Sequence, residues 1–224
     1  MGEALGQVVS VNVGRARTVE WHGRSVTTAI WKAPVDGPVS VGDEQLAGDE
    51  QADLRVHGGV DKAVYAYSVE NYGWWAGSMP DTAFGPGLFG ENLTTEGVDL
   101  EAAVIGERWA VGSAVLEVSE PRFPCSKLGI RMGDAAFVDR FAQAGRPGTY
   151  LAIEAEGDLG AGDTVHRLHR PHHGLTIGTV ERAYNAQPHL IPRLIEVDDL
   201  SESWRDWANR AMARTPRGQA RARR

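Results

Sequence analysis

The sequence predicts an α+β fold in which a β-rich main domain, residues 1–171, precedes a small three-helix domain, residues 172–213. Twenty-seven glycines among 224 residues are too many for a helical bundle and indicate many turns between short strands. After Arg170-Pro171 the pattern changes, and apolar residues recur three and four positions apart, as on one face of a helix. We therefore expect strands before this boundary and helices after it.

The strands of the main domain are predicted from short β-branched stretches that are bounded by polar turns. Residues 5–13 and 26–31 are the first two such stretches, and residues 149–157 and 160–168 are the last two. Residues 104–118 alternate around a Gly-Ser pair, which predicts a β-hairpin.

Three segments between these strands are predicted as loops or connections. Residues 34–51 are acidic and rich in Gly and Pro, as in a connection between elements. Residues 84–95 (FGPGLFGENLTT) form a glycine-rich loop that enters a strand, and residues 119–129 (SEPRFPCSKLG) form a loop restrained by prolines.

Helices are predicted where apolar residues follow a helical spacing. In the main domain, Ser68 is the expected N-cap of a helix that begins at Val69, and residues 134–143 form a short amphipathic helix. The three C-terminal helices are expected at residues 176–186, 189–197 and 201–214, with Thr176 and Ser201 as caps.

Charge and cysteine content exclude several classes of protein. The single cysteine, Cys125, cannot form an intramolecular disulfide or by itself a multi-cysteine zinc or iron–sulfur site. No apolar run of membrane-spanning length occurs, and the N-terminus lacks the features of a signal peptide, so we expect a cytoplasmic protein with no membrane partner. A net charge of −7 argues against a general nucleic-acid-binding protein, although residues 214–224 form a basic, flexible tail that could dock on an acidic partner.

Cys125 lies in a segment that restrains the backbone and places cations beside the thiol. Prolines precede it in PRFPCSKLG, and Arg122 and Lys127 lie three residues before it and two residues after it. Cationic neighbours favour the thiolate, which is the nucleophilic and metal-binding form of cysteine. The alternative is a small buried hydrophobic residue, which is a common role of free cysteine.

Two further motifs offer polar groups to a ligand. In HGGVDKAVYAY, Gly58-Gly59 permits a turn with free amide N–H groups, and His57 and Lys62 flank it with donors suited to phosphate. In FGENLTT, Asn92 offers both a donor and an acceptor, which suits the edge of a heterocycle. Each motif is also compatible with an ordinary structural turn.

Together, HGGVDKAVYAY, FGENLTTEGVDLEAAVIGERWAVGSAVLEVSEPRFPCSKL and AGDTV resemble the motifs of the MOSC family, named after the C-terminal domain of molybdenum cofactor sulfurases. The helices after Arg170 resemble the three-helix domain of its YiiM-like branch. The resemblance extends from about residue 30 to residue 213. It implies a β-barrel-like fold that binds molybdenum cofactor, a molybdopterin. It also implies that Cys125 is the sulfur ligand of molybdenum, with His57, Lys62, Asn92, Arg122 and Lys127 as cofactor contacts.

The YiiM-like branch is associated with reduction of N-hydroxylated compounds, including N-hydroxylated base analogues. The resemblance therefore implies an oxidoreductase that acts on a small-molecule substrate. Its electrons would come from an external donor, a flavoprotein reductase, because the chain has no flavin fingerprint and no iron–sulfur cysteine set. Two alternatives stay open at this point. One is a sulfur carrier with a persulfide on Cys125, and the other is a binding module that uses the helices and the basic tail.

Overall fold

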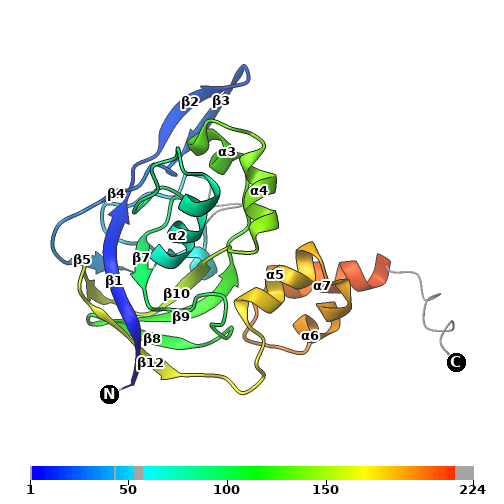
Figure 1. The fold of residues 1–224 in the computed structure, drawn as a ribbon. Coiled ribbons are helices and arrows are strands. Elements are labelled where there is room, and N and C mark those ends of the chain that lie inside the picture. Colours follow the sequence, from blue (N-terminus) through cyan, green and yellow to red (C-terminus); the bar gives the residue numbers. More distant parts are fainter. Residues whose placement is uncertain (1, 43, 53–57, 215–224) are drawn as a thin grey trace, which may run out of the picture.

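A closed β-barrel forms the body of the protein in the computed structural model, which describes residues 2–42, 44–52 and 58–214 (Figure 1). Within those residues, seven strands hydrogen-bond in the order β12-β8-β9-β10-β6-β7-β1, and β1 pairs back with β12 to close the ring. The barrel strands are β1 (Glu3–Val13), β6 (Val64–Ser68), β7 (Leu93–Glu96), β8 (Arg108–Val111), β9 (Ala114–Pro121), β10 (Thr149–Ala155) and β12 (Thr164–His169). The expected barrel-like, α+β fold is confirmed.

The remaining described strands lie outside this ring. β4 (Ala33–Pro34) extends the sheet beside β1, and β5 (Val39–Val41) pairs with β11 (Gly157–Leu159). β2 (Arg17–Trp21) and β3 (Arg24–Thr28) form a hairpin that projects from the barrel (Figure 1). The segment predicted as one strand over residues 26–31 therefore ends at Thr28, and its last residues reach the barrel as irregular backbone.

One pairing in the barrel is parallel, between β6 and β7, and it requires a crossover connection. The connection contains α2 (Val69–Ser78), whose predicted N-cap is confirmed because Ser68 Oγ accepts a hydrogen bond from the Asn71 N–H at 3.2 Å. The predicted hairpin over residues 104–118 is also confirmed as β8 and β9. Gly112 turns it with a φ of +59°, where a Cβ would lie 2.2 Å from Asp158 O.

Two short helices, α3 (Ser126–Met132) and α4 (Phe137–Ala144), cover one side of the barrel. The expected 119–129 loop is therefore shorter than predicted, because β9 continues to Pro121 and α3 begins directly after Cys125. Aromatic side chains fill the space between these helices and the barrel. The buried residues of this cluster are Ile30, Tyr65, Tyr67, Tyr72, Trp75, Phe89, Leu128, Phe137 and Phe141.

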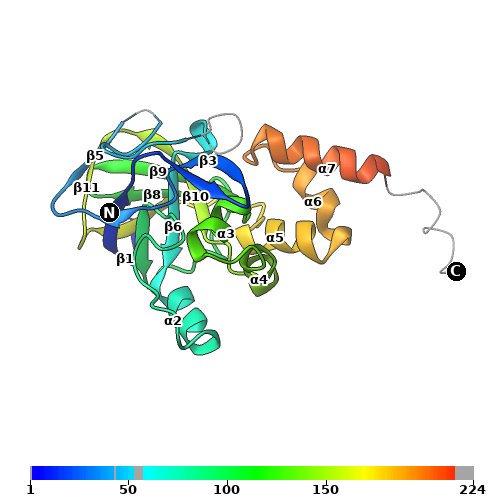
Figure 2. The ribbon, with the colours of Figure 1, turned by 90° about the horizontal axis from the view of Figure 1, so that it is seen from above.

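The C-terminal helices α5 (Ile177–Asn185), α6 (Ile191–Ile195) and α7 (Glu202–Arg214) lie together on one side of the barrel (Figure 2). Short 3₁₀ turns occur at η1 (Val60–Lys62) and η2 (Pro188–Leu190). Thr176 caps α5 as predicted, with its Oγ1 accepting from the Thr179 N–H at 3.2 Å.

Buried apolar side chains run without a break from the barrel into the C-terminal helices. Val180 and Leu194 belong to the same cluster as the barrel residues Val8 and Leu116. The division into two domains at residue 171 stays a prediction, and the basic tail from residue 215 onward lies outside the described residues. No helix in the described part of the chain combines the length and the apolar character that a membrane span requires.

Candidate functional site

A cavity with about 630 Å³ of empty space, its open mouth included, lies where the 119–129 segment meets the barrel. Residues from six parts of the chain line it. Its lining residues are Thr28, Ala29, Ile30, Lys32, Asp49, Glu50, Gln51, Ala52, Lys62, Ala63, Tyr65, Phe89, Gly90, Asn92, Arg122, Cys125, Lys127 and Tyr150. Five of the six predicted site residues are therefore brought together here, and the sixth, His57, lies outside the described residues.

Cys125 reaches this cavity from the extended backbone between β9 and α3. Its thiol forms no disulfide and is partly buried, and its φ of −131° and ψ of 176° mark the last residue before the helix. Pro121 is the last residue of β9, and Pro124 directly precedes Cys125; each lacks a backbone N–H and fixes φ. This local chemistry keeps Cys125 at the cavity wall.

Arg122 is buried beside the thiol, and one of its terminal nitrogens lacks an acceptor. The guanidinium carbon lies 5.3 Å from the centre of the Tyr65 ring and 5.2 Å from that of Phe141, and the residue is only 5% exposed. Its Nη1 has no hydrogen-bond partner among the described residues. A buried donor without an acceptor lowers the stability of the folded protein by roughly 1–3 kcal/mol. An anionic or polar ligand that accepts from Nη1 would remove this penalty, so the arrangement is suited to such a ligand.

The phenol groups around Arg122 remain neutral near pH 7. Burial raises the pKa of Tyr150 to about 12, against the opposing effect of the nearby Arg122 charge. Burial opposes the charge on Arg122 in turn, but Tyr65 and Tyr150 favour it, and its pKa is raised overall. This wall of the cavity thus carries a positive charge between neutral aromatic groups.

Two lysines add positive charge to the lining. Lys62 Nζ lies 3.5 Å from Glu120 Oε1, and the lysine side chain is 25% exposed. Lys127 lines the cavity from the first turn of α3. Glu120 itself is buried, and this burial raises the pKa of its carboxyl group although Lys62 lowers it.

Asn92 lies at the cavity wall, but its side chain already has partners within the protein. Its Oδ1 accepts from the Tyr65 N–H at 3.0 Å. Its Nδ2 donates to Asp49 Oδ2 at 2.8 Å and to Asn12 O at 3.3 Å. Both amide hydrogens are used in these bonds, so Asn92 supports Asp49 and β6. Its predicted contact with a heterocycle stays a prediction.

Sequence reasoning missed the ion pair between Lys32 and Asp49, both of which line the cavity. Their side chains are only 9% and 2% exposed. Asp49 falls in the acidic 34–51 segment, which resembles any solvated connection, and Lys32 follows the first hairpin with no motif around it. A lone acid in an acidic stretch carries no sequence signal of burial, so only the structure pairs these residues.

The glycine loop before β7 is held by Glu91, which is fully buried. Its carboxylate accepts from the Tyr72 hydroxyl at 2.6 Å and from the backbone N–H groups of Gly87 at 2.6 Å and Phe89 at 3.1 Å. Gly90, with a φ of +82°, packs so closely that a Cβ would lie 2.8 Å from Ile30 Cγ1. The loop and the Ile30 segment therefore form one rigid wall.

A comparison with family models places this cavity in a known family. The MOSC domain model matches residues 53–166, which include β6, the glycine loop and the Cys125 segment. The chain belongs to the MOSC domain family. MOSC domains are associated with molybdenum cofactor binding in general.

Three relatives extend this assignment beyond the matched MOSC region. YflK of Bacillus subtilis, an uncharacterized protein, is 36% identical over 201 residues, which span 88% of this chain and 90% of YflK. The crystal structure of YiiM from Geobacillus stearothermophilus superposes with a TM-score of 0.77 at 30% identity, covering 92% of this chain and 98% of that one. A protein of Gibberella moniliformis named "Reductase" is 33% identical over 87% of this chain, but the match spans only 35% of that longer protein.

Proposed function

We propose that this MOSC protein binds molybdenum cofactor in the cavity, with Cys125 as the thiolate ligand of molybdenum, and reduces N-hydroxylated compounds. The observation that carries the proposal is the position of Cys125 at a cavity wall beside Arg122, whose buried Nη1 lacks an acceptor. Because the chain has one cysteine, Cys125 is the only thiolate it can offer, and further sulfur ligands must belong to the cofactor.

The residues of the cavity fit an anionic, heterocyclic cofactor. Arg122, Lys62 and Lys127 supply positive charge for its phosphate group. Tyr65 and Phe89 supply aromatic surface in the same cavity. When bound, the cofactor supplies the two-electron redox chemistry, as cofactors generally carry the chemistry that side chains cannot perform.

The reaction consumes two electrons and two protons for each molecule of substrate. The N–O bond of R–NH–OH breaks, the amine R–NH₂ is released, and the oxygen leaves as water. We assign the electron supply to an external flavoprotein reductase in the cytoplasm, because the sequence has no flavin fingerprint and its single cysteine cannot hold an iron–sulfur cluster. The relative named "Reductase" supports this class of reaction.

The test is molybdenum analysis of protein expressed in cells that make the cofactor. We expect wild-type protein to contain molybdenum and to reduce 6-hydroxylaminopurine with a reduced viologen dye as electron donor. Cys125→Ala should lose both the metal and the activity. Ser126→Ala changes the exposed residue next to Cys125 and is the matched control, which should keep both. Full metal content and activity in Cys125→Ala would refute the proposed ligand.

The same preparations separate this function from sulfur transfer. A sulfur carrier would hold a persulfide on Cys125, so intact-protein mass spectrometry after gentle purification would show the added mass of one sulfur atom. We expect no such adduct on wild-type protein that contains molybdenum. A persulfide on metal-free protein, with no reductase activity, would favour the carrier.

A further inference from the structure

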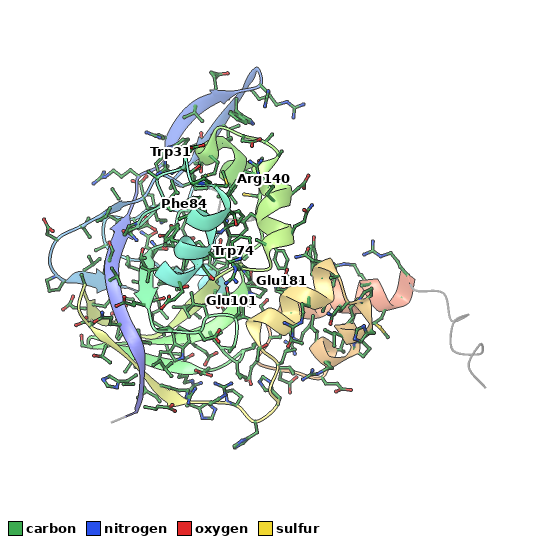
Figure 3. The ribbon with its side chains drawn as sticks, viewed as in Figure 1. Trp31, Trp74, Phe84, Glu101, Arg140 and Glu181 are labelled. Carbon is green, nitrogen blue, oxygen red and sulfur yellow. The ribbon has the colours of Figure 1, made fainter. Side chains whose placement is uncertain are left out.

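The buried ion pair of Lys32 and Asp49 lies on the cavity wall and has no part in the proposed cofactor binding. Lys32 connects the projecting β2–β3 hairpin to β4. Trp31, its neighbour, lies at the base of that hairpin, and the guanidinium carbon of Arg17 stands 3.6 Å from the centre of its ring (Figure 3). Lys32 therefore belongs to a well-packed segment.

A buried ion pair of this kind is poor evidence for a purely structural role. Removing two charges from water is expensive, and apolar residues of similar size often stabilise a protein equally well or better. An ammonium group carries three N–H donors. Asp49 accepts one of them, and no second acceptor for Lys32 is found within residues 2–42, 44–52 and 58–214. The remaining donors are available to a ligand in the cavity that Lys32 lines.

Asp49 is held firmly enough to orient this ammonium group. Its Oδ1 accepts from the Gly14 N–H at 2.8 Å, and its Oδ2 accepts from Asn92 Nδ2 at 2.8 Å. Gly14 can approach so closely because it has no side chain, since a Cβ there would lie 2.5 Å from Trp31 O. The pair is thus fixed to Gly14, which directly follows β1, and to Asn92, which directly precedes β7.

The proposed reduction needs a proton donor at the oxygen that leaves. Hydroxide is a poor leaving group, and a positioned acid typically accelerates such a step by about 10²–10⁴-fold. Arg122 cannot serve, because a guanidinium does not release its proton in proteins. Tyr150 is a weak acid, since burial raises its pKa to about 12. Lys62 is partly exposed and is paired with Glu120.

We propose that Lys32 donates this proton to the departing hydroxyl oxygen of the substrate and that Asp49 is its positioning residue. The inference rests on the proposed reductase function. As the N–O bond breaks, the Lys32 Nζ–H bond breaks and an O–H bond forms, which releases water. The flavoprotein reductase supplies the electron pair. Solvent returns a proton to the Lys32 amine through the open cavity and delivers the second proton to the nitrogen of the product.

The electrostatics of the site are consistent with this role. Burial lowers the pKa of Lys32, while the charge and hydrogen bond of Asp49 act in the opposite direction. The lowered pKa makes the ammonium proton easier to release than that of a solvated lysine, while the contact with Asp49 favours the charged form.

The deciding experiment is chemical rescue of Lys32→Ala. We expect this variant to keep the molybdenum content of the wild type but to lose about 100-fold in kcat with 6-hydroxylaminopurine. Added ethylammonium should restore turnover, because the space left by the Lys32 side chain admits a small protonated amine that can donate the proton. Arg24→Ala removes an exposed cation on β3 of the same hairpin and is the matched control, with kcat unchanged.

The other outcomes would overturn the inference, and one of them would also overturn the proposed function. Loss of molybdenum from Lys32→Ala, or kcat within about threefold of wild type, would overturn proton donation by Lys32. If Lys32→Ala does not fold, Lys32→Arg decides, because it keeps the charge but cannot release a proton. Full turnover in Lys32→Arg would then overturn the inference. A wild-type protein without reductase activity overturns the proposed function as well, whereas an active wild type with an active variant overturns this inference alone.

Discussion

The Ser201 hydroxyl, at the start of the last helix, donates a hydrogen bond of 2.9 Å to Glu120 Oε2. The other oxygen of the same carboxylate lies 3.5 Å from Lys62 Nζ, which lines the cavity. Ser201 was predicted as a helix cap. In the structure Ser201 directly precedes α7, and its hydroxyl joins that helix to β9 through a buried carboxylate; its role as a side-chain cap stays a prediction. The C-terminal helices thus contact the site through Glu120, whose carboxylate also lies close to Lys62 at the cavity wall.

Ser201→Ala should destabilise the protein by about 1–3 kcal/mol, because it removes a donor from a buried carboxylate oxygen. Urea denaturation measures this difference as a shift in midpoint at constant slope. Ser25→Ala is the matched control, since Ser25 is exposed on β3, and it should stay within about 0.5 kcal/mol of wild type. Equal stability of the two variants would contradict a structural role for the Ser201–Glu120 bond.

Glu120→Gln should change how stability depends on pH. Burial raises the pKa of Glu120 in the folded protein, so folding favours the protonated form. The stability gained from this preference is complete below the unfolded value of about 4.3, and it is lost as pH rises through the folded value. Wild-type stability relative to Glu120→Gln should therefore decrease between acidic and neutral pH, as measured by urea unfolding across that range. A difference that does not vary with pH would show that the carboxyl group is not desolvated.

Much of the fold could be predicted because its local signals are strong. The caps at Ser68 and Thr176 and the Gly112 hairpin each depend on residues close together in the sequence, and all three were confirmed. Closure of the barrel depends instead on pairing of β1 with β12, from opposite ends of the main domain. Strand periodicity alone does not encode such a register, so the expectation of a barrel came from family resemblance.

The site was predictable to the extent that its residues lie in distinctive segments. Arg122, Cys125 and Lys127 share one proline-restrained segment, and the structure brings them together with Lys62. Lys32 could not be found in this way, because its importance comes from burial and from a partner seventeen positions away. Asn92 was found for its donor and acceptor groups, but which partners those groups bind depends on tertiary contacts.

Asn92→Ala should destabilise the protein by more than about 2 kcal/mol, because the buried Tyr65 N–H loses its acceptor and the buried Asp49 loses a donor. Chemical denaturation of metal-free protein measures this cost without the cofactor. Asn209→Ala is a suitable control, since Asn209 is exposed on α7, and we expect a change within about 0.5 kcal/mol. A similarly small effect at Asn92 would mean that its amide group serves a ligand rather than the fold.

Trp204→Ala tests whether the C-terminal helices fold together with the barrel. Trp204 is 8% exposed, and its ring lies 4.8 Å from that of Phe123, two residues before Cys125, and 5.6 Å from that of Tyr184. Replacing it with alanine should lower the free energy of unfolding by about 3–5 kcal/mol, as for other buried aromatic residues. Trp74→Ala is the matched control, because Trp74 is 40% exposed on α2 (Figure 3).

The expected result for Trp204→Ala is one cooperative transition at lower denaturant concentration, with faster amide hydrogen exchange in both α7 and the barrel strand β9. The reason is that the buried apolar cluster runs from Leu116 in β9 through Val180 in α5 to Trp204 itself. Two independent domains would instead unfold in two steps, with fast exchange confined to residues 172–213 and full protection in β9. That outcome would establish the boundary at residue 171 as a real unit of folding, and it would require Phe123 and Glu120 to keep their positions without support from α7.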